Sequence, residues 1–381
     1  MAYFDNAATT FPKPECVYDQ MDQFYRHAGG SVGRGNYAMS RSAKQLMDET
    51  RGQITNLLHC PTRQVIFQPT ATLVLNMIVQ GLISGGVKNI YISPFEHNAV
   101  TRILHHFEML KQVAVFQLTV TKDLQYDLER IRYQFDNDRP DLVIVSHASN
   151  VIGLVAPTEE IFGLAKQYGA LTVLDMAQTA GIVDCNVGLD TFDFAVFAGH
   201  KTLLGPTGIS GFVMKSDIGL PTVLFGGTGF ESANQDMPDS LPERFEIGTM
   251  NILGIAGLNA ALKWIHEQSV SKLYQEESAK RKRLLELFAR YDFIQTVGNI
   301  EGRRYVGIVS CVIDGISSDI AGQLFSERNI SVRTGLHCAP LAHRFLGTYP
   351  AGTIRFSVNS LTSDDDFAAL DAALADIGDN L

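Results

Sequence analysis

The stretch from Leu142 to Gln178 decides the fold. It consists of LVIVSHASN (residues 142–150), VIGLVAPTEEIFGLAKQYGA (residues 151–170) and LTVLDMAQ (residues 171–178). The first and third segments begin with short runs that are apolar at nearly every position, which is typical of strands buried on both faces of a parallel sheet. Between them, apolar residues recur at helical spacing from Thr158 to Tyr168, which predicts a crossover helix. The stretch therefore predicts a strand–helix–strand unit of an α/β protein.

Similar apolar runs recur before residue 200. They lie at residues 65–67, 89–92, 113–120 and 194–197. Together with the central unit they predict a mostly parallel sheet flanked by helices. From about residue 250 the pattern changes to two long helical stretches and then to alternating segments; these lie at Ile252–Gln268, Val270–Tyr291, 306–313 and 330–332. We therefore predict a large α/β domain over residues 15–250 and a smaller α+β domain made by residues 1–14 and 251–381.

Composition and charge exclude several classes of protein. The chain has 381 residues, of which 45% are hydrophobic and 19% are charged, so it can bury a large core. Its net charge of -10 argues against general binding to nucleic acid. Five widely spaced cysteines without a CxxC pair predict neither a disulfide framework nor a metal site, which favours a reducing compartment. No signal-like start or run of about 18 apolar residues is present, so we expect a cytoplasmic protein without a membrane span.

Polar side chains follow four of the predicted strands at the point where each strand ends. In open α/β sheets, ligands bind outside the carboxyl ends of the strands. The side chains concerned are His97, Asn150, Asp175, Gln178, His200 and Lys201. Taken singly, each has an ordinary explanation, since an aspartate after a strand often caps a helix and a lone histidine is often a hydrogen-bonded, partly buried residue. Their accumulation at one edge favours a ligand site.

An anion site is predicted at the same edge. The run at residues 65–67 is followed by Pro69-Thr-Ala-Thr72 and then by the apolar stretch from Leu73 to Ile83, which predicts a buried helix. The first backbone N–H groups of this helix, a threonine hydroxyl and the helix dipole would bind a phosphate. Ordinary capping of the helix by a threonine is the alternative.

A phosphate site, Asp175 and Lys201 together are what pyridoxal phosphate requires. An aspartate keeps the pyridine nitrogen protonated, which makes the ring an electron sink, and a lysine binds the aldehyde. Burial and nearby cations depress the pKa of such a lysine and favour its nucleophilic form. A surface lysine in a glycine-rich turn is the alternative for Lys201, but so apolar a strand rarely leads into a surface turn. A nucleotide-binding enzyme is not favoured, because Gly227-Thr-Gly229 lacks the third glycine of the dinucleotide fingerprint.

At this point the sequence resembles the class V aminotransferase family, and within it the cysteine desulfurases, along nearly the whole chain. The motifs that carry the resemblance are YFDNAATT (3–10), FEHN (95–98), HASNVIG (147–153), DMAQ (175–178), GHK (199–201), GPTG (205–208), RFEIGT (244–249), RTGLHCAP (333–340) and TIR (353–355). Their order and spacing, more than any single motif, make the resemblance specific. It implies the fold of type I pyridoxal 5'-phosphate-dependent transferases.

The resemblance implies a role for each residue of the predicted cofactor site. Lys201 would bind the cofactor aldehyde, and Asp175 would pair with the pyridine nitrogen. Gln178 would bond to the phenolic oxygen, and the ring of His97 would stack on the cofactor. The phosphate would be bound by the backbone amide of Ala71, Thr72 and His200. Thr249 would reach the phosphate of the neighbouring subunit's cofactor, which implies a homodimer with shared active sites.

The resemblance also implies a substrate site. Arg355 would bind the substrate carboxylate in a bidentate manner, and Asn150 would contact substrate and cofactor. Arg333 is assigned to the same site. Arg34 matches an arginine near the active-site entrance of the family, although a surface arginine in a turn is an equal alternative.

Cys338 distinguishes the desulfurases from their relatives. It lies between Arg333 and Pro340 with His337 adjacent, and nearby positive groups favour a reactive thiolate. A lone cysteine is usually a small buried hydrophobe, but that explanation suits Cys185 or Cys311 better. Ordinary aminotransferases of this class do not need a thiol here, whereas in desulfurases the thiol receives the sulfur.

The sequence therefore predicts an enzyme that converts L-cysteine to L-alanine and transfers the sulfur to Cys338 as a persulfide and then to an acceptor protein. Lys201 and His97 would carry protons during this reaction. The short spacing between Cys338 and Arg355 resembles the group II desulfurases. Alternatives are a selenocysteine lyase acting on L-selenocysteine, a C–S lyase, another class V aminotransferase-type enzyme, and a non-catalytic scaffold.

Overall fold

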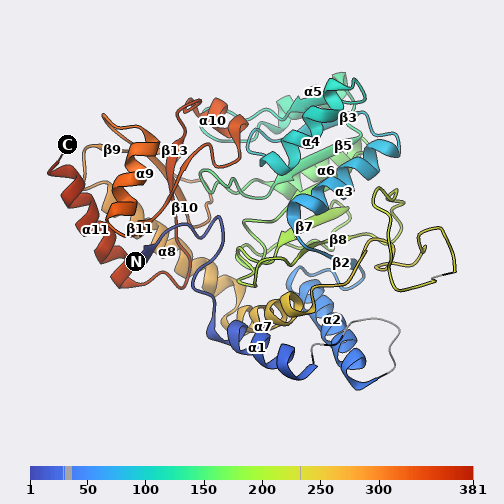
Figure 1. The fold of residues 1–381 in the computed structure, drawn as a ribbon. Coiled ribbons are helices and arrows are strands. Elements are labelled where there is room, and N and C mark those ends of the chain that lie inside the picture. Colours follow the sequence, from blue (N-terminus) through green and yellow to red (C-terminus); the bar gives the residue numbers. More distant parts are fainter. Residues whose placement is uncertain (29, 31–36, 232, 381) are drawn as a thin grey trace.

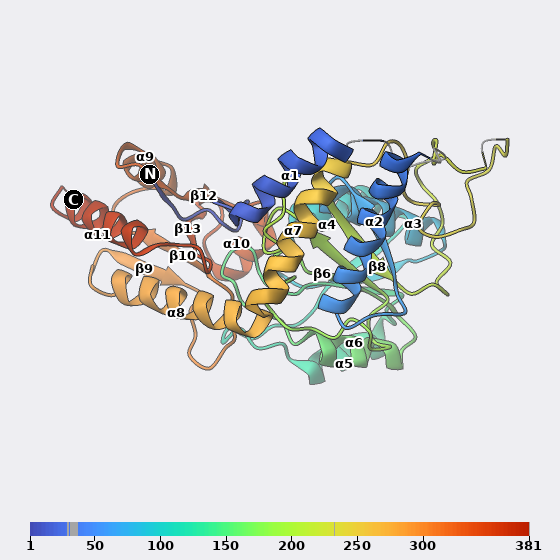
Figure 2. The ribbon, with the colours of Figure 1, turned by 90° about the horizontal axis from the view of Figure 1, so that it is seen from below.

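The computed structural model describes residues 1–28, 30, 37–231 and 233–380. It has two lobes, shown in Figure 1 and, from below, in Figure 2. The larger lobe is built on a seven-stranded sheet, and the smaller lobe contains four-stranded and two-stranded sheets. Side chains from both lobes line one cavity.

The large sheet has the strand order β2-β8-β7-β6-β5-β3-β4. Its strands are β2 (Gln64–Gln68), β3 (Asn89–Ile92), β4 (Ala114–Gln117), β5 (Leu142–Ser146), β6 (Leu171–Asp175), β7 (Phe194–Ala198) and β8 (Ser210–Met214). Neighbouring strands are parallel except at β8, which is antiparallel to both β2 and β7. The mostly parallel α/β sheet predicted from the sequence is confirmed.

Two features of this sheet differ from the sequence prediction. The run at residues 65–67 forms β2, but β2 pairs antiparallel with β8, which the sequence analysis did not identify as a strand. A glycine is needed in β8 because a Cβ at Gly211 would lie 2.3 Å from the backbone oxygen of Ile66. The run at residues 113–120 forms the short edge strand β4, whose two end residues are exposed, and not a strand buried on both faces.

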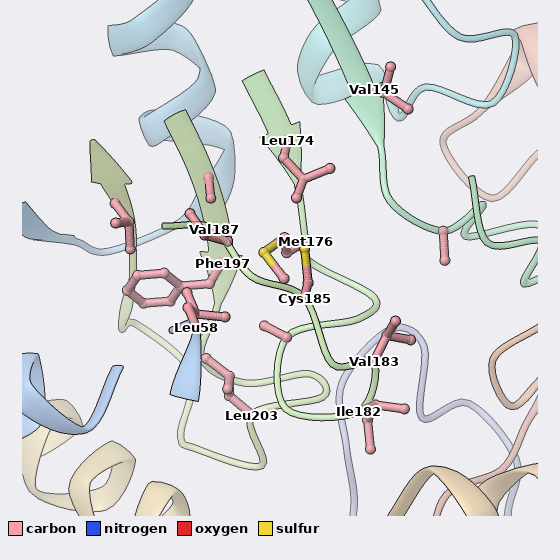
Figure 3. Close-up of a cluster of buried hydrophobic side chains, with 14 of the residues drawn as sticks. Leu58, Val145, Leu174, Met176, Ile182, Val183, Cys185, Val187, Phe197 and Leu203 are labelled. Atoms are coloured by element: carbon pink, nitrogen blue, oxygen red, sulfur yellow. The ribbon is translucent and has the colours of Figure 1, made fainter. Parts of the chain in front are cut away.

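Helices cover both faces of the large sheet. On one face lie α3 (Ala71–Ser84) and α4 (Asn98–Met109), and on the other lie α1 (Glu15–Ala28), α2 (Ala38–Leu57), α5 (Leu128–Asn137), α6 (Thr158–Gln167) and α7 (Ile252–Gln268). Successive strand residues point to opposite faces, so Val196 packs in the core with α3 and α4. Phe197 packs in the opposite core, where Figure 3 shows it with Leu174 and other buried side chains.

The smaller lobe has a four-stranded antiparallel sheet with the order β12-β13-β10-β9. Its strands are β9 (Ile294–Val297), β10 (Ile308–Ile313), β12 (Arg333–Gly335) and β13 (Thr353–Ser357), and its helices are α8 (Val270–Phe288), α9 (Ser318–Glu327), α10 (Pro340–Leu346) and α11 (Asp364–Gly378). The N-terminal strand β1 (Ala2–Tyr3) pairs in parallel with β11 (Ile330–Ser331). The buried ring of Phe356 makes edge contacts with three other rings, those of Phe4, Phe288 and Phe325.

The domain boundaries at residues 14 and 250 stay a prediction. Helix α7 contributes Ile255 and Ile265 to the same core as the large sheet, which favours a boundary after Gln268. None of the described helices combines the length and the apolar character needed to cross a bilayer.

Candidate active site

A cavity of about 300 Å³ lies at the carboxyl ends of β5, β6 and β7. Residues from both lobes line it, and these include Ala71, Thr72, His97, Asn150, Asp175, Gln178, His200, Lys201, Arg333 and Arg355. The parallel register explains part of this arrangement, because Ser146 at the end of β5 lies beside Asp175 at the end of β6. The structure thus brings together most of the residues that the sequence analysis placed around one cofactor and its substrate.

Lys201 and Asp175 contribute an amine and a carboxylate to this cavity. Loss of hydration lowers the pKa of Lys201 to about 8, and the Asp175 charge opposes this effect. An appreciable fraction of the amine is therefore neutral and nucleophilic near neutral pH. Burial raises the pKa of Asp175, while a hydrogen bond from the amide of Ala177 and the charge of Lys201 favour the carboxylate.

The amino end of α3 faces the same cavity. Thr70 is its N-cap, and the Thr70 hydroxyl oxygen accepts a hydrogen bond from the Leu73 amide at 3.2 Å. A threonine therefore caps the helix, and this threonine is Thr70. Ala71 and Thr72 belong to the first turn, which lines the cavity with its amides and the Thr72 hydroxyl. Amides of a first turn have no intrahelical acceptor, so they are suited to bind an anion.

His97 stands between this cavity and a second one. It caps α4, and its Nδ1 accepts a hydrogen bond from the Ala99 amide at 3.0 Å. Burial, reinforced by the positive charge of Lys201, lowers the pKa of His97 to about 4. The ring is therefore neutral and carries its proton on Nε2. His97 also lines the adjoining cavity of about 510 Å³, to which Cys338 contributes.

Cys338 lies in the loop between β12 and α10. Its Sγ accepts a hydrogen bond from Nη2 of Arg333 at 3.3 Å. His337, expected to be another positive group beside the thiol, is buried and has its Nε2 2.9 Å from the Thr353 hydroxyl. Because burial lowers the pKa of His337 to about 2, it is uncharged, so the expectation was wrong for His337. Arg333 provides the positive charge next to the sulfur.

Comparison with known proteins identifies the family. Residues 2–370 match the family described as "Aminotransferase class-V". The chain belongs to this family. A "Probable cysteine desulfurase" of Pyrococcus abyssi is 30% identical over 371 residues, covering 95% of this chain and 90% of the relative. A "Cysteine desulfurase" of Salmonella agona is 30% identical over 351 residues, covering 89% of this chain and 84% of that relative. The solved apo structure of a cysteine desulfurase from Thermococcus onnurineus NA1 has a TM-score of 0.92 and 26% identity, covering 100% of this chain and 95% of that one.

Class V aminotransferases are pyridoxal phosphate enzymes, and the cavity has the groups that this cofactor needs. A lysine amine, a carboxylate and the amino end of α3 all line this cavity. Several buried polar atoms of lining residues have no hydrogen-bond partner within the described part of the chain: Asn150 Oδ1, His200 Nδ1, His337 Nδ1 and Arg355 Nε. Unpaired buried polar atoms are costly, so the donor and acceptor set fits a polar ligand.

Arg34 and Thr249 are assigned to the site by the resemblance but are not among the described residues that line either cavity. Arg34 lies outside the described residues. Thr249 is exposed and is not among the described residues that line the cavity.

Glu96 is a buried residue near the site that the sequence analysis did not single out. It is fully buried, and its carboxylate accepts hydrogen bonds from the Ser93 hydroxyl (2.6 Å) and from the amide (2.6 Å) and hydroxyl (2.7 Å) of Ser146. It therefore ties the loop that carries His97 to the end of β5. The only sequence signal was its place next to His97 in the FEHN motif, since its partner Ser146 lies 50 positions away.

Glu96→Gln is expected to remove a pH dependence of stability. Burial raises the pKa of Glu96 to about 7, so the folded state retains a proton that the unfolded chain releases near its ordinary value of 4.5. The wild type therefore loses stability as the pH rises from 4.5 to 7, whereas glutamine cannot titrate. Between about pH 5 and pH 8, the free energy of unfolding of the variant should rise relative to wild type by about 2 kcal/mol, measured by urea unfolding. A constant difference between the two proteins would show that Glu96 does not titrate in this range.

Proposed function

We propose that this chain is a cysteine desulfurase, which converts L-cysteine to L-alanine and carries the sulfur as a persulfide on Cys338. One observation carries the proposal: the Cys338 sulfur accepts a hydrogen bond from the Arg333 guanidinium. Cys338 lines a cavity with His97, and His97 also lines the adjoining cavity of Lys201 and Asp175. The match to relatives with this printed name over most of the chain supports it. A lyase or transaminase would not use the thiol. The cytoplasmic location and the acceptor protein stay predictions.

Pyridoxal 5'-phosphate would lie in the 300 Å³ cavity. Lys201 would bind its aldehyde, and Asp175 would pair with its ring nitrogen. Gln178 and His97 would contact the ring, and the amino end of α3 with Thr72 and His200 would hold the phosphate. When bound, the cofactor supplies an electron sink for the pair left when the substrate loses its α-proton.

The residues of the chain would perform the remaining work. Arg355 binds the substrate carboxylate, and the Lys201 amine takes the α-proton. The Cys338 thiolate then attacks the substrate sulfur, so that an S–S bond forms and the C–S bond breaks with its electron pair remaining on the carbon side. The β-carbon takes up a proton, and Lys201 returns a proton to the α-carbon, which gives L-alanine. The Nε2–H group of neutral His97 is a proton donor between the two cavities.

We also propose that the chain acts as a homodimer with shared active sites. The segment between β8 and α7 extends away from the large lobe without a helix or strand in its described residues (Figures 1 and 2). It carries the exposed Thr249 and the aromatic rings of Phe225 and Phe230, which are 75% and 48% exposed. Large exposed aromatic side chains on one segment are typical of a protein contact surface. Thr249 would reach the phosphate site of the partner.

The test is mass spectrometry of the cofactor-loaded protein after incubation with L-cysteine. We expect a gain of one sulfur atom on the peptide that contains Cys338. The peptides with Cys185 and Cys311 are internal controls, because both thiols are buried and burial raises their pKa values. A persulfide depends on an accessible thiolate, so these peptides should stay unchanged. Sulfur on all three peptides, or on none, would contradict the proposal.

A further inference from the structure

Arg355 is held by two groups from different parts of the chain. Its side chain is only 1% exposed. Nη2 donates a hydrogen bond to Asp5 Oδ1 at 2.8 Å, and Nη1 donates one to the backbone oxygen of Asn150 at 2.9 Å. Nε is buried without a partner in the described chain. Since a guanidinium has five N–H groups in a rigid fork, these contacts leave donors for a further anion and fix the direction in which they point.

Asp5 is an acidic neighbour of Arg355, whose other charged neighbours include the basic side chain of Arg333. Besides burial, the positive charge of Arg333 lowers the pKa of Arg355, and the charges of Arg355 and Arg333 both lower the pKa of Lys201. Burial lowers the pKa of Arg355, and the charge and hydrogen bond of Asp5 oppose this effect. Asp5 therefore offsets part of the cost of keeping the buried guanidinium charged before a ligand arrives.

The N-terminal arm that carries Asp5 also contacts the loop of Lys201. The Thr10 amide donates to the His200 backbone oxygen at 3.1 Å, and the Thr10 hydroxyl donates to the Lys201 backbone oxygen at 2.8 Å. An isolated parallel β-bridge between the backbones of Asp5 and Ser357 joins the start of the arm to β13, the strand that carries Arg355. The arm thus connects the strand that carries the guanidinium to the loop that carries the amine.

We propose that Asp5 is a positioning residue for the carboxylate of the amino-acid substrate, because it orients the Arg355 guanidinium toward the cavity and keeps it at a fixed place relative to Lys201. This inference rests on the proposed function, in which Arg355 binds that carboxylate. Asp5 does not contact the reacting atoms. Its loss should therefore weaken ligands that have an α-carboxylate and leave amines without one unaffected.

The test compares L-alanine with ethylamine, which is the same amine without the carboxylate. Binding of each to the cofactor-loaded protein is measured by calorimetry. For Asp5→Ala we expect about tenfold weaker binding of L-alanine, the effect of one charged hydrogen bond, and unchanged binding of ethylamine. Asp5→Asn keeps the side-chain shape and gives the same comparison if the alanine variant does not fold.

Ser357→Ala is the matched control for loosening of the arm. The Ser357 hydroxyl accepts from the Ala7 amide at 2.8 Å and donates to the Phe4 backbone oxygen at 3.2 Å, so its removal loosens the arm without removing a partner of Arg355. We expect it to leave the ratio of the two affinities unchanged. An equal change of that ratio in Ser357→Ala, or equal weakening of both ligands by a folded Asp5 variant, would overturn the inference.

Arg355→Lys separates this inference from the proposed function. It should weaken L-alanine relative to ethylamine, because lysine cannot form the bidentate contact. If Arg355→Lys has this effect and the Asp5 variants do not, the role of Asp5 is wrong and the proposed function stands. If Arg355→Lys leaves both affinities unchanged, the carboxylate does not bind Arg355, and both the substrate site and the role of Asp5 are wrong.

Discussion

Lys201→Ala is expected to abolish covalent attachment of the cofactor and to reduce L-alanine formation from L-cysteine by about 10³-fold or more. The reason is that one amine has two roles, as the group that binds the cofactor aldehyde and as the group that moves the α-proton. Its pKa is lowered to about 8, so it can serve as nucleophile and base near neutral pH. Lys201→Arg should be equally inactive, because an arginine stays protonated and supplies charge without a free electron pair.

The measurement is borohydride reduction of the cofactor-loaded protein followed by peptide mass spectrometry. The wild type should carry the reduced cofactor on Lys201, and the variant should carry none. Lys13 is the matched control, because burial also lowers its pKa to about 8 and its Nζ lies 3.3 Å from the His200 backbone oxygen. Lys13→Ala should still be labelled on Lys201. Label on Lys13 in the wild type would contradict the assignment.

Residues at the ends of the parallel strands could be placed from the sequence. An apolar run that ends in a polar residue marks both a strand and its carboxyl end, and neighbouring parallel strands end at one edge. The registration of Asp175 beside Ser146 follows from that rule. The helix after Thr70 could be predicted for a similar reason, because its apolar residues and its cap are neighbours in sequence.

Contacts that depend on distant segments could not be predicted in this way. Strand β8 has the short sequence SGFVM, whose strand character comes from pairing with β2 and β7. The sequence analysis assigned residues 1–14 to the smaller domain, but it did not predict the contact between Asp5 and Arg355, which lie 350 positions apart. The charge state of His337 depends on its burial in the folded protein, which its place beside Cys338 did not reveal.

Cys338→Ala is expected to reduce L-alanine formation from L-cysteine by about 10³-fold or more, since the thiolate that attacks the substrate sulfur is absent. The cofactor site is separate, so borohydride should still label Lys201 in this variant. Cys16→Ala is the control for cysteine replacement in general, because Cys16 is exposed on α1 and outside both cavities as the described residues define them. Its activity should equal that of the wild type.

The substrate dependence of Cys338→Ala separates a desulfurase from its relatives. A selenol leaves carbon more readily than a thiol, so cleavage of L-selenocysteine should survive the substitution even where cleavage of L-cysteine does not. A transaminase would retain its activity on an amino acid and a keto acid, because that reaction has no sulfur nucleophile. Wild-type activity of the variant on L-cysteine would show that Cys338 does not receive the sulfur. In that case the Arg333 contact would be a structural hydrogen bond, whereas the site of Lys201 and Asp175 would be unaffected.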